Sequence, residues 1–332
     1  MKRLNITVFI RELGHEVALV TWTLYKLMIP ALIVVKLLQE MGALEYLSHF
    51  LAPLMSLLGL PESMGIVWAT TIMTNFYAGM AVFFELARSE SLTVAQVTVL
   101  STVLLVSHGL PVEARIAQRA GVRLAVTLVT RLGGAFLFGF ILHHIYSAGG
   151  FLEQHSELAW EPVAIDSSLR AWLLTQLKSL LVIPLIVAAL LGLLKILGLL
   201  GVDKLLNFLL APFLRLMGIG REAITLTVVG VTLGLSFGGG LLIREAERGH
   251  ISRRDVFASI TMLGLCHSLI EDTLLMMLMG AHLSGILWLR IVFTLLIMAL
   301  LSFWLRRVDD EFIDRWLINR HLAPASDSDG TN

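Results

Sequence analysis

Two histidines and three carboxylates lie in stretches of sequence that are otherwise apolar. His267, Glu271 and Asp272 fall within six residues in "CHSLIEDTLLMM", and His108 precedes Glu113 in "VSHGLPVEAR". An ionised carboxylate at the centre of a bilayer costs roughly 2.5–3.5 kcal/mol on insertion scales. Such acids therefore need a cationic partner, water or a bound proton. His267 and Glu271 are four residues apart, which places them on one helix face.

Three uses of the His267–Glu271 pair remain open. The first is a hydrogen bond inside a helix bundle. The second is a proton-coupling or ion-coupling site, because imidazole titrates near neutrality. The third is a divalent metal site in which both side chains are ligands, although two ligands need further donors from elsewhere in the chain.

Arginines supply candidate partners for the acids. Arg131 and Arg290 each lie about nine residues into an apolar run, too deep to reach the membrane surface easily. We expect Arg131 to pair with Glu113, and Arg290 to pair with Asp272 or Glu271. The symmetry of the two arginines favours a structural role for these ion pairs.

Small and polar residues interrupt two other apolar runs, at "TNFYAGM" (74–80) and "LGLSFGGG" (233–240). Glycine and small polar residues favour a tight turn over a continuous helix. Asn75, Tyr77, Ser236 and Gly238 are therefore candidate contacts for a solute or an ion. The alternative is that the glycines serve only close helix packing.

The elements that position these residues are membrane helices. The chain has 332 residues, 57% of them hydrophobic, and a mean hydropathy of +0.83, well above a soluble domain. Apolar runs long enough to cross a bilayer occupy 17–41, 64–87, 93–114, 122–146, 171–200, 223–243, 253–280 and 283–305. Shorter amphipathic pieces lie at 44–58 and 203–217.

An internal duplication organises these runs. "LAPLMSLLGL" (51–60) returns as "LAPFLRLMGI" (210–219) in the second half of the chain. The same offset, without a gap, pairs His108 with His267 and Arg131 with Arg290. Gly109 and Pro111 weaken the helix after His108, whereas no proline follows His267, so the second broken helix is expected to be the less interrupted one.

The charge distribution favours re-entrant hairpins at 64–87 and 223–243. With eight full crossings, Arg115 and its neighbours would lie outside the membrane and the acidic linker inside, against the positive-inside rule. If the two segments are re-entrant hairpins, the arginines lie inside and the acidic linker lies outside, as the rule requires. The predicted fold is an all-α integral membrane protein with two inverted repeats, each with three transmembrane helices, one re-entrant helical hairpin and a short amphipathic helix. The predicted segments are an amphipathic N-terminal segment (1–16), repeat 1 (17–147), an acidic external linker (148–169), repeat 2 (170–306) and a cytoplasmic tail (307–332).

The sequence resembles a known family in two places. "LGLSFGGGLLIREAERGHISRRDVFASITMLGLCHS" (233–268) and "TNFYAGMAVFFELARSESLTVAQVTVLSTVLLVSHG" (74–109) are similar to the Gate, or nucleoside recognition, domain. Similar segments occur in concentrative nucleoside transporters, the membrane domain of ferrous iron transporter B, and spore maturation proteins A and B. The resemblance covers most of 45–140 and 200–300, and it implies this fold while leaving the substrate open.

Taken together, these features predict a transporter that moves a small, nucleoside-like solute or an ion by alternating access. The alternatives are a divalent metal permease and a non-transporting scaffold or signalling protein. Substrate or ion contacts are expected from His108, Glu113, His267, Glu271, Asp272 and the hairpin-turn residues.

We expect no enzymatic activity and no cofactor, because no nucleophile–base arrangement is evident. The zero net charge gives no reason to expect nucleic-acid binding. Expected partners are membrane lipid, the solute or ion, and, as one candidate assembly, a second copy. The expected location is the inner membrane with both termini cytoplasmic.

Overall fold

Helices form nearly all of the described structure. A computed structural model of the chain describes residues 6–87, 90–157 and 169–318. Within these ranges, β-structure is limited to two isolated bridges. The N-terminal half contains α1 (Ile6–Glu40), α2 (Ala43–Leu57), α3 (Met64–Met73), α4 (Phe76–Leu86), α5 (Val94–Ser107), α6 (Leu110–Arg119), α7 (Leu124–Leu128), the π-helix η2 (Val129–Gly133) and α8 (Gly134–Gly149). The C-terminal half contains α9 (Leu169–Leu199), α10 (Val202–Leu216), α11 (Arg221–Leu233), α12 (Leu235–Glu247), α13 (Arg253–Leu265), α14 (Glu271–Leu278), the π-helix η3 (Ser284–Leu289), α15 (Arg290–Leu305), α16 (Asp310–Phe312) and the π-helix η4 (Ile313–Leu317).

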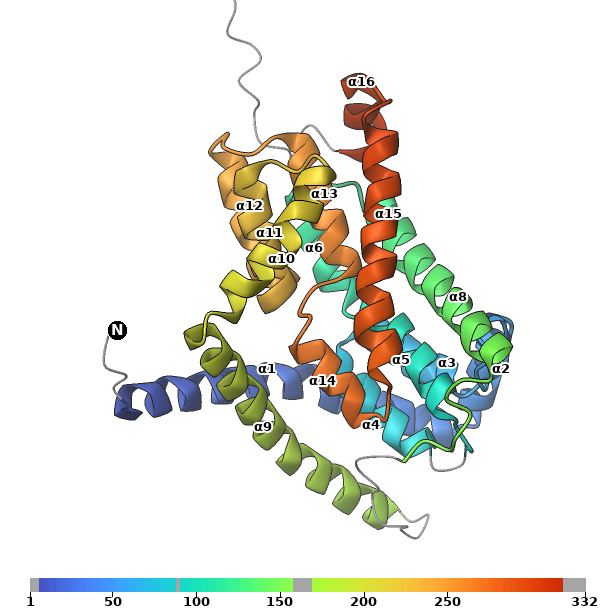
Figure 1. The fold of residues 1–332 in the computed structure, drawn as a ribbon. Helices are drawn as coiled ribbons and strands as arrows, with labels where there is room; N and C mark the ends of the chain where they lie inside the picture. The colour runs from blue at the N-terminus through green and yellow to red at the C-terminus, as the bar shows by residue number, and fades with distance from the viewer. Residues whose placement is uncertain (1–5, 88–89, 158–168, 319–332) are drawn as a thin grey trace, which may run out of the picture.

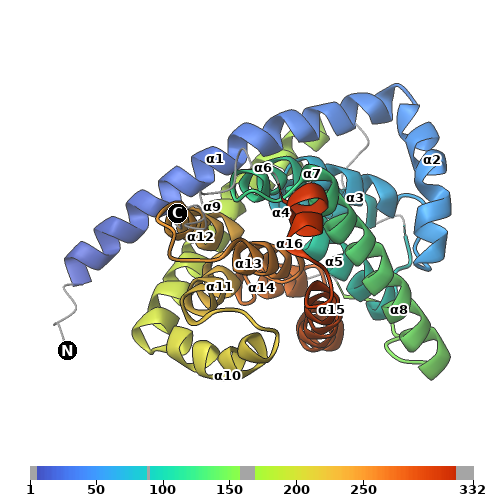
Figure 2. The same ribbon diagram turned by 90° about the horizontal axis from the view of Figure 1, so that it is seen from above.

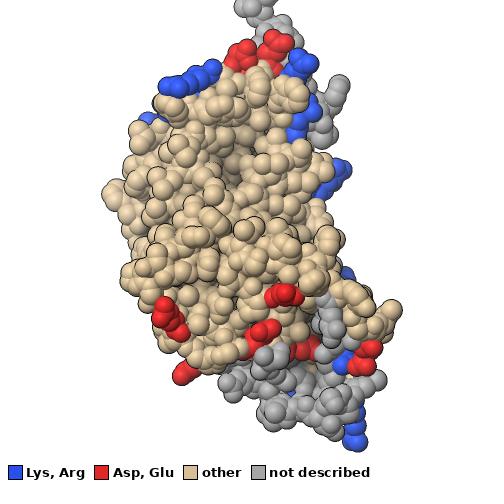
Figure 3. All heavy atoms as spheres, turned by 90° about the vertical axis from the view of Figure 1, so that its right-hand side faces the viewer, with Lys and Arg blue, Asp and Glu red and all other residues tan. Residues whose placement is uncertain are grey.

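Five of these helical stretches are long and apolar enough to cross a membrane: Arg11–Leu38, Val94–Arg119, Leu124–Gly149, Gln176–Leu199 and Ser284–Leu305. The expected crossing at 253–280 is not among them because its helix is interrupted over 266–270. Figure 3 shows a broad uncharged surface on one face, with most charged side chains toward its two ends and a few at one edge. This distribution suits a protein whose middle lies in hydrocarbon.

The two amphipathic helices lie where the sequence predicts them, as α2 and α10. The expected boundary at residue 16 does not correspond to a helix end, since α1 runs without interruption from Ile6 to Glu40. Helix α1 packs against α9, and Lys195 Nζ lies 2.9 Å from Glu16 Oε1. Figure 2 shows α1 along one side of the bundle.

A pair of short helices occupies each region where a hairpin is expected. Helix α3 turns into α4 at Thr74–Asn75, and α11 turns into α12 at Gly234. The arms are in close contact: a Cβ on Gly79 would lie 1.8 Å from Thr71 Oγ1, and a Cβ on Gly238 would lie 2.3 Å from the Gly230 Cα. The three glycines at 238–240 were expected in the turn, but they lie within α12, where the absence of a side chain at Gly238 permits this close contact.

The helix breaks differ from the prediction. The first separates α5 from α6 at His108 and Gly109, and the second separates α13 from α14 over the longer stretch 266–270. The expectation that the second helix would be less interrupted was therefore wrong. Both breaks contain a left-handed residue: Ser268 adopts φ 45°, close to the φ 54° of Gly109 at the equivalent position. The break is maintained there by tertiary contacts, without a residue that favours it.

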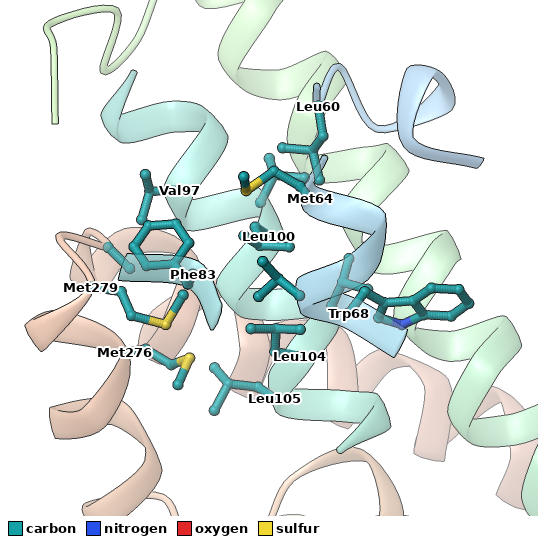
Figure 4. Packing of buried hydrophobic residues seen from close by; sticks show 14 of the residues in the cluster. Leu60, Met64, Trp68, Phe83, Val97, Leu100, Leu104, Leu105, Met276 and Met279 are labelled. Carbon is teal, nitrogen blue, oxygen red and sulfur yellow. The ribbon is translucent and has the colours of Figure 1, made fainter. Parts of the chain in front are cut away.

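Equivalent residues of the two halves each pack in the apolar cluster of the opposite half. Ala117, Ala120 and Val122 pack in the apolar cluster formed mainly by the C-terminal half. Their counterparts in the second repeat, Met276, Met279 and Ala281, pack in the cluster formed mainly by the N-terminal half. Figure 4 shows Met276 and Met279 beside Phe83 and the α5 leucines. Each half therefore contributes side chains to the apolar cluster of the other half.

Two equivalent pairs of helices run in opposite directions in one view. In Figure 1, α5 leads upward to α6, whereas α13 leads downward to α14.

Residues of the expected linker pack on the start of α5, where Val94 N donates to Gln154 O at 3.0 Å. The first part of the expected tail docks beside α7, where Arg123 N donates to Leu317 O at 2.9 Å. Linker residues 158–168 and tail residues 319–332 lie outside the described residues.

Candidate functional site

The two broken helices bring the two equivalent histidines together. His108 Nε2 lies 3.2 Å from His267 Nε2. Oε1 of Glu113 lies 3.1 Å from His108 Nε2 and 3.2 Å from His267 Nε2. All three residues are buried. Because equivalent atoms of the two halves touch, this triangle lies where the halves meet.

Backbone carbonyls determine which nitrogen of each ring carries hydrogen. His108 Nδ1 lies 3.2 Å from Leu105 O, and His267 Nδ1 lies 2.5 Å from Leu263 O. A carbonyl oxygen only accepts hydrogen bonds, so each Nδ1 is the donor. In the neutral rings, both Nε2 atoms then present lone pairs to each other and to the carboxylate oxygen. Three converging acceptors repel one another unless a cation, either a proton or a metal ion, lies among them.

Arg131 holds Glu113 in this position. Nη1 of Arg131 bonds to Oε2 of Glu113, which confirms the expected ion pair. The same guanidinium donates to Val106 O at 2.8 Å and to His108 O at 3.0 Å. These carbonyls lie at the end of α5, where helical acceptors lack partners and cations are favoured. Glu113 lies in the first turn of α6, where anions are favoured.

The C-terminal half repeats the arginine but not the ion pair. Arg290 donates to Leu265 O at 3.4 Å and to His267 O at 3.1 Å. Its Nη1 and the Oδ2 of Asp272 are buried without hydrogen-bond partners among the described residues. The expected pairing of Arg290 with Asp272 or Glu271 is therefore wrong for this structure. The two halves are equivalent in sequence position but differ in bonding.

Glu271 also lies apart from the triangle. It is half-buried in the first turn of α14, and the group of converging ligand atoms contains His108, Glu113 and His267 instead. The group of converging atoms thus contains His267 without Glu271, and its carboxylate comes from the other half. Spacing within one helix could not reveal a partner in the other half of the chain.

The hairpin-turn candidates lie in different settings. Asn75 caps α4, accepting from Ala78 N at 3.0 Å, and its Nδ2 is buried without a partner among the described residues. Tyr77 packs against two apolar clusters, and Gly238 touches the Gly230 backbone. Ser236 lies in the first turn of α12, and its side chain is outside the described residues.

One site residue was missed by sequence reasoning. The ring of Phe76 lies over that of His108, with centroids 3.9 Å apart and planes inclined by 34°. Phe76 begins α4 directly after the hairpin turn, and Gly109 N donates to Thr71 O at 3.0 Å beside it. The hairpin thus covers the break. No feature distinguishes Phe76 in sequence from the other phenylalanines of the apolar runs.

Comparisons with known proteins find one family model and one relative that covers most of the chain. The family model described as "Gate: Nucleoside recognition" matches residues 21–125. The chain is 31% identical over 288 residues to the uncharacterised membrane protein YvoD of Bacillus subtilis strain 168, a match that covers 86% of this chain and 91% of YvoD. No solved structure matches the chain significantly.

Proposed function

Because the chain belongs to the Gate family of membrane proteins, we propose that it moves a cation across the membrane by alternating access. The observation that supports this proposal is the triangle of His108, His267 and Glu113, three buried acceptors directed at one another. Such an arrangement favours a bound cation on electrostatic grounds alone. In transporters built from inverted repeats, ions bind near the midplane where the repeats meet and helices are broken.

An inverted-repeat mechanism accounts for the unequal arginines. In inverted-repeat transporters the two repeats exchange conformations between the inward-open and outward-open states. Arg131 is paired with Glu113 here, whereas Arg290 has a free Nη1 and Asp272 a free Oδ2 among the described residues. We propose that the opposite state pairs Arg290 with Asp272 and releases Glu113. The change would alter the charge on the cation site without moving either arginine out of the bundle.

The proposed membrane arrangement follows the same logic. The hairpin helices have 10 and 11 residues in α3 and α4 and 13 residues each in α11 and α12. At 1.5 Å per residue they span about half to two thirds of a ~30 Å hydrocarbon core. We therefore propose that both hairpins are re-entrant and that the repeats are inverted. Both termini would then lie on the cytoplasmic side of an inner membrane.

A flux assay with an engineered lock tests the proposal. A Cβ at Gly239 of α12 would lie 2.7 Å from Ile116 Cγ2 of α6, so Ile116→Cys with Gly239→Cys is positioned for a disulfide between the halves. We expect purified protein in proteoliposomes to carry protons or divalent metal ions, to stop when the pair is oxidised, and to resume on reduction. Each single variant is the control for the pair.

A non-transporting scaffold is the second candidate function. The observation that favours it is that both arginines bind backbone carbonyls at the helix breaks, as groups that only stabilise a fold would. A reconstituted wild-type protein that carries none of these cations would contradict transport and favour the scaffold.

A further inference from the structure

We propose that His108, His267 and Glu113 form the binding site of one divalent first-row transition-metal ion. The role of this ion as cargo rests on the proposed cation transport, whereas the site itself rests on geometry. The ligand atoms are Nε2 of each histidine and Oε1 of the carboxylate.

The spacing of the three atoms fits one coordination face. Their mutual separations are 3.1, 3.2 and 3.2 Å. Bonds of about 2.0–2.2 Å place ligand atoms of a tetrahedral ion about 3.3–3.6 Å apart, and neighbouring ligand atoms of an octahedral ion about 2.8–3.1 Å apart. The observed triangle lies between these values. An ion bonded to all three atoms would sit about 1 Å out of their plane, leaving at least one position for water or another ligand.

The donor types select among divalent ions. Two imidazole nitrogens and one carboxylate oxygen suit zinc, iron, cobalt, nickel and manganese, whereas magnesium and calcium prefer oxygen ligands alone. The same two-histidine, one-carboxylate set occurs in metal sites that keep open positions. A site that must release its ion benefits from such incomplete coordination.

The surroundings orient the ligands as metal sites require. Metal-bound histidines almost always donate their second ring N–H to a carbonyl or carboxylate, as His108 and His267 do through Nδ1. Arg131 occupies Oε2 of Glu113, which leaves Oε1 to bind as a single donor. Phe76 covers the His108 ring and shields that side.

Metal binding to purified protein tests the site directly. The protein, freed of any affinity tag and stripped with chelator, is titrated with Co²⁺ and Zn²⁺ in detergent. We expect one ion bound per chain, visible ligand-field bands typical of Co²⁺ with few ligands, and a higher melting temperature. Mg²⁺ is expected to leave the melting temperature unchanged and to show no stoichiometric binding. His108→Gln and His267→Gln should each weaken binding at least tenfold.

His144→Gln is the matched control, because His144 is exposed on α8 and should bind as wild type. Gel filtration and the melting curve without metal show whether each variant is folded. If one histidine variant fails to fold, the other supplies the same comparison. Absence of stoichiometric binding, or binding that survives both histidine substitutions, overturns the metal site.

Flux in proteoliposomes separates this inference from the proposed function. Metal binding with metal flux supports both. Metal binding without flux of any cation supports the site and contradicts transport. Proton flux that depends on His108 and His267, without metal binding, contradicts the metal site and leaves cation transport standing. Neither binding nor flux contradicts both.

Discussion

The unequal bonding of the two carboxylates can be tested by removing each charge in turn. Glu113→Gln and Asp272→Asn are equivalent changes at equivalent positions, since each replaces a buried carboxylate with its amide. Glu113 is bonded to Arg131 through Oε2 and approached by two histidines through Oε1. Asp272 Oδ2 has no hydrogen-bond partner among the described residues. The structure therefore predicts different costs.

The magnitudes follow from what each change leaves unpaired. Removing one partner of a buried ion pair costs about 3–5 kcal/mol because the other charge stays buried. The glutamine oxygen can still accept one hydrogen bond, which recovers about 1 kcal/mol. Glu113→Gln should then cost about 2–4 kcal/mol. Asp272→Asn breaks no observed bond and should cost no more than about 1 kcal/mol.

Thermal unfolding in detergent with chelator present measures the contrast without a metal contribution. At about 2–4 °C per kcal/mol, the value for domains of about 150–250 residues, Glu113→Gln should lower the midpoint by roughly 4–16 °C. Asp272→Asn should lower it by about 4 °C at most. Arg131→Met combined with Glu113→Gln should recover part of the loss, because no charge is left unpaired. Equal shifts for the two amides, or a larger shift for Asp272→Asn, would refute the asymmetry.

Three further outcomes are expected. Gly238→Ala should destabilise the protein by about 1–3 kcal/mol because its Cβ would lie 2.3 Å from the Gly230 Cα. Gly240→Ala, whose Cβ would meet no atom within 4 Å, should stabilise the helix by up to about 1 kcal/mol through higher helix propensity. Chemical denaturation compares the two variants, and equal effects would count against the hairpin contact. Ser268→Val should lower the free energy of unfolding by about 1–3 kcal/mol because Ser268 has φ 45°, whereas Ser268→Gly should leave it nearly unchanged in the same assay. A valine variant as stable as wild type would contradict backbone strain at this position. Arg115→Cys should react with an impermeant maleimide from the cytoplasmic side, and reaction from the outside would contradict the re-entrant arrangement.

Much of the fold could be predicted from residue types and their spacing. Apolar runs, the constant register of the duplication and the small residues at the turns locate both amphipathic helices and both hairpins. The buried Arg131–Glu113 pair follows too, because a charge deep in an apolar run needs an opposite charge in a neighbouring helix. These features depend on local pattern and on the cost of burying charge, and both can be read along the chain.

Only the tertiary structure decides which groups meet across the halves. Spacing predicts His267 with Glu271 on one helix face, but the break at 266–270 separates them and turns His267 toward Glu113 and His108. The break itself is not encoded by proline or glycine, because packing holds Ser268 in a left-handed conformation. The pairing of Arg131 and the free Nη1 of Arg290 depend on which of two similar arrangements each half adopts. Residue types predict an arginine–carboxylate pair in each half, whereas only the tertiary structure shows that, among the described residues, Arg131 makes one and Arg290 does not.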